Sequence, residues 1–293
     1  MGNNIASTSV FALVFCVFSA IAPVSAQFAH AAMMPAISIF PARVMQGEPF
    51  KIAVEQVAVI HVKSISFAGK NLDTFLYQGK PSAFAPADLS QKAGTYLVAV
   101  TLTDGRVLEK NIVVSARPKV EAPLGIPEKL GGNTPTSATA LVTTLADENR
   151  QLVGITTAPS VLWSGTFAFP LAKITVTDSY GYSRQTSGYT IAHKGTDFRA
   201  AESTSVAAMN RGIVRLAKNF RNYGNTIVVD HGLGLMTFYM HLSKINVKIG
   251  DTVERGQVIG LSGQTGYAEQ PHLHVTVRIN DISIDPMKFM LLF

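Results

Sequence analysis

Short runs in which apolar and polar residues alternate, each ended by turn residues, occupy most of this sequence. One series extends from residue 37 to about residue 116, and a second begins at residue 166 and continues to the end. Alternation with a period of two is typical of strands that bury one face. No long helical periodicity interrupts the second series. The sequence therefore predicts an all-β, mainly antiparallel chain with little helix.

The first series predicts a small β-sandwich, Ig-like in general shape, which we assign to residues 27–117. Its clearest signal is a hairpin, because residues 96–102 and 107–114 are two strand-like runs separated by Thr103-Asp104-Gly105-Arg106. An Asp-Gly pair between two such runs is a strong hairpin signal. Short strands at this spacing favour two packed sheets.

Residues 118–165 differ in character and predict a linker with a short helix. Prolines and glycines are frequent at residues 117–127, which favours extended chain. Thr136 or Ser137 could then cap a helix that runs to about Gln151, with Glu148 and Arg150 on its polar side. We expect this segment to position the two β regions and to line a groove.

The first residues predict a secretory signal peptide at 1–26. An apolar run at residues 9–24 precedes Val24-Ser25-Ala26-Gln27, and cleavage is expected near Ala26, with a second site at Ala29-His30-Ala31. Residues 1–26 contain no Lys or Arg, so an uncleaved anchor is the alternative. Cleavage removes Cys16, the single cysteine, and excludes disulfides. We expect a secreted or periplasmic protein of the cell envelope without a stable membrane span.

The net charge favours an anionic partner. The chain of 293 residues carries a formal charge of +6, which suits nucleic acid, membrane or an acidic polymer such as a cell wall. Lys and Arg are scattered, and no basic run is interleaved with aromatic residues. A nucleic-acid partner is therefore not expected.

The histidines point to a metal site in the second β region. Five of the seven histidines fall there. His272 and His274 lie two apart in a strand-like run, so both imidazoles face the same side. His193 and Asp197 are four apart in extended chain and also share a face. Together with one imidazole of the pair they make three ligands, the number found in catalytic zinc sites.

The donor set favours zinc over magnesium or calcium, because those ions prefer oxygen ligands. His241 and the remaining histidine of the pair are then available for proton transfer. His231 precedes a glycine, and we interpret it as a structural turn residue.

Three motifs in this order resemble the lysostaphin/LytM-type zinc metalloendopeptidases, which cleave peptide bonds in bacterial peptidoglycan. The motifs are His193-Lys194-Gly195-Thr196-Asp197, Tyr239-Met240-His241-Leu242-Ser243 and Pro271-His272-Leu273-His274. The resemblance covers roughly residues 165–290. It implies that residues 166–293 are a zinc metallopeptidase domain, an antiparallel β-sheet of the LytM or duplicated hybrid motif type. The implied substrate is the peptide part of peptidoglycan, in its cross-links or stem peptides.

The resemblance also implies a role for each residue. His193, Asp197 and His274 would bind one Zn²⁺ per chain. His241 and His272 would be catalytic, positioning the zinc-bound water and assisting proton transfer. A contribution from Tyr182 or Tyr189 is left open.

Two alternatives remain. Some relatives have lost ligands and act as silent regulators or wall-binding modules that activate another wall hydrolase, which would give this protein a wall-enzyme partner. Zinc could also serve only to stabilise the fold. The complete set of ligands and catalytic histidines favours a hydrolase. One departure concerns specificity: Glu269-Gln270 precedes the Pro-His pair, where relatives often carry Thr-Gly or Ser-Gly.

Overall fold

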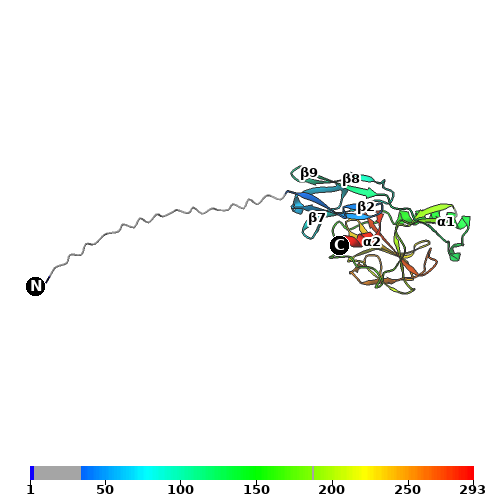
Figure 1. The fold of residues 1–293 in the computed structure, drawn as a ribbon. Coiled ribbons are helices and arrows are strands. Elements are labelled where there is room, and N and C mark those ends of the chain that lie inside the picture. The colour runs from blue at the N-terminus through cyan, green and yellow to red at the C-terminus, as the bar shows by residue number, and fades with distance from the viewer. Residues whose placement is uncertain (3–33, 187) are drawn as a thin grey trace. The chain divides into compact units, whose positions relative to one another are not determined.

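A computed structural model describes residues 1–2, 34–186 and 188–293 (Figure 1). Apart from its first two residues, the predicted signal peptide, with its cleavage sites and Cys16, lies outside these ranges. Residues Met34–Phe293 form one compact unit. None of the helices in the described ranges has the length and apolar character needed to cross a bilayer. The mostly β fold that the sequence predicts is confirmed.

The first series of runs forms two sheets that share one apolar core. Ile52 from one sheet and Val98 from the other are fully buried members of the same cluster. One sheet has the order β1 (Ala36–Phe40), β3 (Pro49–Glu55), β7 (Lys80–Pro86), β6 (Phe75–Tyr77). The other has the order β2 (Arg43–Met45), β9 (Val107–Ser115), β8 (Gly94–Leu102), β4 (Val62–Phe67), β5 (Lys70–Leu72), and the 3₁₀ turn η1 (Val59–His61) precedes β4 (Figure 1).

The predicted hairpin is present in the second of these sheets. β8 and β9 pair in antiparallel register, with Thr101 opposite Val107, and Asp104 and Gly105 form the turn between them. Gly105 has a φ of 90°, which a side chain would disfavour. The Ig-like character of the two sheets stays a prediction.

The connecting segment contains β10 (Glu121–Pro123), the 3₁₀ turn η2 (Glu128–Leu130) and the helix α1 (Pro135–Gln151). The helix begins before the predicted cap, because Thr134 is the N-cap and its Oγ1 accepts a hydrogen bond from the Ser137 backbone N–H at 3.1 Å. Pro135 fits the first helical position, where no backbone N–H is needed. The prediction of Thr136 or Ser137 as the cap was therefore wrong.

Glu148, which was predicted to lie on the polar side of α1, is buried against polar backbone groups. Its carboxylate accepts hydrogen bonds from the backbone N–H groups of Asn222 and Tyr223 at 2.9 and 3.2 Å. These bonds pair two backbone N–H groups in the turn before β17 that α1 would otherwise bury without an acceptor. They fix α1 against the second β region.

The second series of runs forms the large sheet on which the candidate site is built. Its order is β11 (Val176–Asp178), β14 (Thr196–Arg199), β22 (His272–Ile279), β18 (Leu235–Leu242), β17 (Gly224–Gly232), β16 (Gly212–Phe220), β20 (Thr252–Val253), and β23 (Ile282–Ile284) pairs with β22. Two smaller sheets flank it, with the orders β10, β12 (Ser183–Thr186), β13 (Tyr189–Ala192) and β15 (Ser205–Ala207), β21 (Val258–Leu261), β19 (Lys244–Ile245). The chain ends in α2 (Pro286–Phe289) and the turn η3 (Met290–Leu292).

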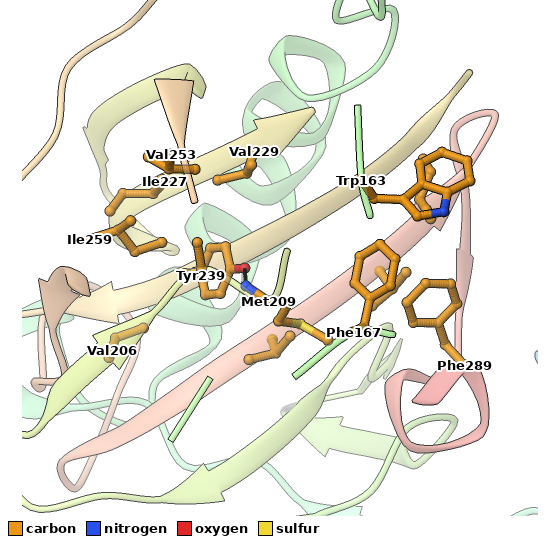
Figure 2. Packing of buried hydrophobic residues seen from close by; sticks show 14 of the residues in the cluster. Trp163, Phe167, Val206, Met209, Ile227, Val229, Tyr239, Val253, Ile259 and Phe289 are labelled. Carbon is orange, nitrogen blue, oxygen red and sulfur yellow. Dashed lines mark hydrogen bonds between the residues drawn. The ribbon is translucent and has the colours of Figure 1, made fainter. Parts of the chain in front are cut away.

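The two faces of the large sheet pack against different partners. Figure 2 shows one face, where Tyr239 lies among aliphatic residues and its hydroxyl accepts the Met209 backbone N–H at 2.8 Å. Its strand neighbour Phe238 belongs to a second cluster, with Met240 and with Leu152 from the end of α1. Successive residues of a strand face opposite sides, so Phe238 and Met240 lie on the second face. Leu152, the residue that follows α1, packs on that face. This explains why every residue of β18 is buried.

The first two sheets also contact the second β region. The ring of Phe84 in β7 packs against the rings of Trp163 and Phe289, at centroid distances of 5.9 and 6.1 Å. These aromatic residues belong to the core of the large sheet (Figure 2). The domain boundaries expected near residues 117 and 165 stay predictions.

Candidate metal centre and active site

Strand pairing brings two of the predicted ligands face to face. Asp197 in β14 lies directly opposite His274 in β22. His193 follows β13 and reaches the same point across a short loop that includes Gly195. A Cβ atom at Gly195 would lie 2.3 Å from His274 Nε2, so no other residue fits there without displacing the ligand. Gly195 thus allows the backbone to approach the ligand closely.

Three ligand atoms converge in a buried cluster. Asp197 Oδ1 lies 2.7 Å from His274 Nδ1 and 3.2 Å from His193 Nε2, and the two nitrogens are 3.1 Å apart. All three side chains are buried, and their ligand atoms lie within 4.8 Å of one another. Ligand atoms about 2.0–2.2 Å from one tetrahedral zinc ion are roughly 3.3 Å apart. The spacing of the cluster fits a single metal ion.

The hydrogen bonds that His193 and His274 make outside the cluster determine which ring nitrogen carries the proton. The other nitrogen of each ring then faces the cluster with its lone pair. His193 Nδ1 donates to the Ser179 carbonyl at 2.9 Å, because a carbonyl oxygen can only accept. The Thr276 hydroxyl donates to the Lys194 carbonyl and therefore accepts from His274 Nε2 at 3.0 Å. Both protons thus point outward, as in metal sites whose second shell fixes the histidine tautomer.

A cation is needed to hold these atoms together. Two nitrogen lone pairs and a carboxylate oxygen face one another in a buried site, and they repel unless a positive charge lies between them. Burial lowers the pKa of His274 to about 4 even though Asp197 opposes the shift, so this imidazole favours the neutral form that binds metals. The donor set of two imidazoles and one carboxylate suits zinc.

Arg184 in β12 holds the other oxygen of the aspartate. Its Nη2 donates to Asp197 Oδ2 at 2.5 Å, and its Nε donates to Asp178 Oδ2 at 2.8 Å. Burial alone would raise the pKa of Asp197, but the charges and hydrogen bonds of His193 and His274 outweigh it and lower that pKa well below its usual value. The guanidinium favours the same ionised carboxylate and orients Oδ1 toward the histidines.

The two predicted catalytic histidines lie beside the cluster. The ring of His241 lies 4.8 Å from that of His272 and 6.0 Å from that of His274, measured between centroids. His241 has a φ of 61° in a stretch of β18 where the pairing with β17 shifts register. Bulges of this kind re-aim side chains next to active sites.

The outer nitrogens of His241 and His272 are also engaged. His241 Nδ1 donates to the Thr265 carbonyl at 2.9 Å, and His272 Nδ1 donates to the Gln270 carbonyl at 2.8 Å. In each ring Nε2 keeps its lone pair, and His272 Nε2 lies 3.9 Å from Asp197 Oδ1. Burial, followed by the charges of His272 and His274, lowers the pKa of His241 well below its usual value. His241 is therefore neutral and can accept a proton or a hydrogen bond.

His231, Tyr189 and Tyr182 are three further residues that the sequence placed near a possible site, and each contacts neighbouring protein groups. His231 is fully buried, and its two nitrogens contact the Arg211 carbonyl at 2.8 Å and Thr237 Oγ1 at 2.9 Å. The Tyr189 hydroxyl lies 3.2 Å from Thr139 Oγ1 of α1. Tyr182 contributes its backbone carbonyl, which accepts from the His193 N–H at 2.8 Å. His231 thus has structural contacts as expected, but it lies within β17 and not in the predicted turn.

A cleft of about 520 Å³ leads away from the cluster, and sequence reasoning had missed several of its residues. His193, His241 and His274 line it at one end, and Leu141 and Leu145 of α1 line its wall, as expected for a segment bordering a groove. Tyr267 also lines it, and the Tyr267 hydroxyl is buried without a hydrogen-bond partner among the described residues. Burial, and then Glu269, raise its pKa, so it remains a donor.

Comparison with known proteins agrees with this geometry. Residues 191–286 match peptidase family M23. Residues 191–286 are therefore an M23 domain. All three residues of the cluster and both additional histidines lie inside the match.

Named relatives match about a third of the chain. The peptidoglycan DD-endopeptidase ShyA of Vibrio cholerae is 45% identical over 96 residues, which is 33% of this chain and 22% of that protein. Lysostaphin of Staphylococcus staphylolyticus is 41% identical over 119 residues, 38% of this chain and 25% of that protein. The chain thus spans about a quarter of the length of these curated relatives.

A solved structure resembles much more of the chain. The crystal structure of a Pseudomonas aeruginosa protein, provisionally assigned to peptidase M23, has a TM-score of 0.60 and 25% sequence identity. The match covers 85% of this chain and 95% of that one. The similarity therefore reaches well beyond the 96 residues of the M23 domain and includes part of the preceding β region.

Proposed function

We propose that this protein is a zinc-dependent endopeptidase that hydrolyses peptide bonds in the cross-links or stem peptides of bacterial peptidoglycan. The observation that carries the proposal is the convergence of His193, Asp197 and His274 beside the imidazoles of His241 and His272 at one end of a cleft. The M23 match supports the reaction class. The name of ShyA, a peptidoglycan DD-endopeptidase, supports the substrate class.

His193, Asp197 and His274 would hold the metal. When bound, zinc would supply a Lewis acid that polarises the scissile carbonyl and makes water acidic enough to ionise near pH 7. Arg184 keeps Asp197 ionised and oriented through its bond to Oδ2. The outward hydrogen bonds of the two ligand imidazoles keep their lone pairs directed at one point.

His241 and His272 would move the protons. Each ring has its Nδ1–H fixed on a backbone carbonyl, so its Nε2 can accept a proton from the attacking water and later return one to the leaving amine. His272 is the more accessible of the two, with 18% of its side chain exposed. Burial of His241 keeps that ring neutral and ready to accept.

The charge of the chain and its first residues support a location in the cell envelope. A net charge of +6 suits an anionic wall polymer, and the predicted signal peptide would place the protein in the periplasm or outside the cell. A second candidate function is a silent regulator that activates another wall hydrolase. The complete ligand set favours hydrolysis over that role.

Digestion of purified peptidoglycan separates the two functions. We expect the zinc-loaded chain to release new amine termini, and a chelator to abolish the release. His274→Ala should lose both zinc and activity, His241→Ala should keep zinc but lose activity, and the exposed His61→Ala should change neither. Mass spectrometry of the released fragments would identify the bond that is cut. If the wild-type chain releases no amine termini from any wall preparation, hydrolysis is rejected in favour of the regulator.

A further inference from the structure

A buried arginine stands at the far end of the cleft. Arg278 lies in β22 four residues after His274, so the two side chains share one face of the strand. It is 7% exposed and lines the cleft. Its Nη1 donates to the Leu152 carbonyl at 2.6 Å, and its guanidinium lies 4.6 Å from the ring centre of Phe238. Its Nε is buried and has no hydrogen-bond partner among the described residues.

Among the described residues, this cation has no carboxylate in direct contact, and burial lowers its pKa although the charges of Tyr223 and Asp281 oppose the shift. Within the part of the chain that the structure describes, no carboxylate lies within 4.0 Å of its guanidinium nitrogens. The two acidic side chains near this end of the cleft are already engaged. Asp281 accepts from the Gly154 N–H at 3.3 Å, and Glu148 accepts from two backbone N–H groups near β17. A buried charge without a partner is costly, which favours an anion supplied from outside.

One cleft joins this cation to the metal cluster. Its lining includes His274 and Arg278, and Leu141, Leu145 and Met240 contribute apolar walls between the helix and the sheet. A volume of about 520 Å³ is in the range of ligand sites. An apolar channel with a cation at one end and a peptidase site at the other fits an extended peptide that carries a carboxylate.

We propose that Arg278 binds a carboxylate of the peptide substrate through its guanidinium group, and that the wall formed by α1 completes this subsite. This inference rests on the proposed function and specifies its substrate. Four strand residues at about 3.3 Å each separate Arg278 from His274 by ~13 Å. An extended peptide covers that distance in about four residues. The recognised carboxylate should therefore lie about four residues from the bond that is cut.

Binding of paired peptides tests the subsite. The probes are acetylated alanine peptides of three to six residues ending in D-alanine, each prepared as a free acid and as a carboxamide. The titrated protein is the full zinc-loaded chain carrying His241→Ala, so that the probes are not cut. We expect the acid to bind at least tenfold more tightly than the amide. Arg278→Met should abolish that preference, Arg278→Lys should retain part of it, and the exposed Arg255→Met should leave it unchanged.

A second pair of variants keeps the test valid if Arg278→Met does not fold. Leu145 is only partly buried on the cleft wall, whereas its neighbour Ala146 is exposed. Leu145→Glu should remove the acid preference by placing a negative charge in the cleft, and Ala146→Glu should not. Equal binding of acid and amide by the wild-type site, or an unchanged preference in Arg278→Met and Leu145→Glu, would overturn the subsite. So would equally tight binding of inorganic phosphate, which would indicate an unspecific anion site.

Cleavage by the wild-type zinc-loaded chain separately tests the expected distance between the recognised carboxylate and the bond that is cut. Acid probes long enough to reach should be cut about four residues from the carboxylate, and amides should be cut more slowly and at scattered positions. If no peptide is cut, the proposed hydrolysis fails while the titrations still decide the role of Arg278. If peptides are cut without any acid preference, hydrolysis stands and the subsite falls.

Discussion

Asp197 Oδ1 lies 2.7 Å from His274 Nδ1 although 77 positions separate the two residues along the chain. The antiparallel pairing of β14 with β22 sets this distance, and the loop through Gly195 adds His193. The ligands therefore meet only in the folded protein. A metal that binds the folded state alone stabilises it, so zinc content, stability and activity are expected to change together.

Replacing the carboxylate ligand should remove the metal. In Asp197→Asn the neutral amide no longer offsets the positive charge of zinc, and we expect zinc affinity to fall by more than ~100-fold. Metal analysis and titration of the metal-free chain measure the loss, and the rise in melting temperature caused by zinc should disappear. Asp73→Asn, which removes an exposed carboxylate in the first β region, is the matched control. Full zinc occupancy in Asp197→Asn would show that the metal is held elsewhere.

We expect Arg184 to affect activity by orienting Asp197 and not by binding the substrate. Without its bond to Oδ2, Asp197 is less well oriented, and loss of such supporting contacts typically weakens metal binding by about 10- to 100-fold. We expect Arg184→Met to lower zinc affinity by that amount and to recover most of its activity at high zinc concentration. Arg255→Met serves as the control. Weak activity that added zinc fails to restore would argue for a direct role of Arg184 in substrate binding.

We expect the hydroxyl of Tyr267, which has no partner among the described residues, to donate a hydrogen bond to the reacting carbonyl oxygen. Removal of one hydrogen-bond donor to a developing oxyanion typically lowers kcat by about 100-fold or more. We expect Tyr267→Phe to lower kcat by roughly that factor, with little change in KM or zinc content. Tyr189→Phe should have a small effect, because the Tyr189 hydroxyl lies against Thr139. The opposite ranking in steady-state kinetics would assign the donor to Tyr189.

The buried His231 should make stability depend on pH. Burial lowers its pKa from 6.5 to about 4 in the folded state. Above pH 6.5 both states are neutral and His231 contributes no pH dependence. As the pH falls from 6.5 toward 4, the unfolded chain takes up a proton that the folded chain does not, so the free energy of unfolding falls by up to about 1.4 kcal/mol per pH unit.

Urea unfolding at pH 7 and pH 5 measures this contribution. His231→Gln should be less stable at pH 7 but should lose less stability on acidification than the wild-type chain does. The zinc ligands are the same in both proteins, so their titration cancels in the comparison. Parallel losses in the two proteins would mean that His231 is accessible to protons in the folded state.

Local pattern was enough to predict the mostly β fold and to single out the candidate site residues. Alternation with a period of two predicted the hairpin of β8 and β9, and the spacing of His193 with Asp197 and of His272 with His274 predicted shared faces. Strand geometry explains the hairpin and the shared face of His272 and His274, whereas His193 and Asp197 meet across the loop between β13 and β14. The predicted cap of α1 was two residues late, since Thr134 and Pro135 compete for the start of the same helix.

What the sequence alone determined was a set of candidate groups for binding a metal and moving protons, because residue type and short spacing carry that information. Only the tertiary structure decided which groups surround them. Arg184 reaches Asp197 from another sheet, α1 closes the wall of the cleft, and Arg278 is left buried with no carboxylate of the described residues in direct contact. These relationships depend on contacts between residues far apart in the chain, and no local periodicity encodes such contacts.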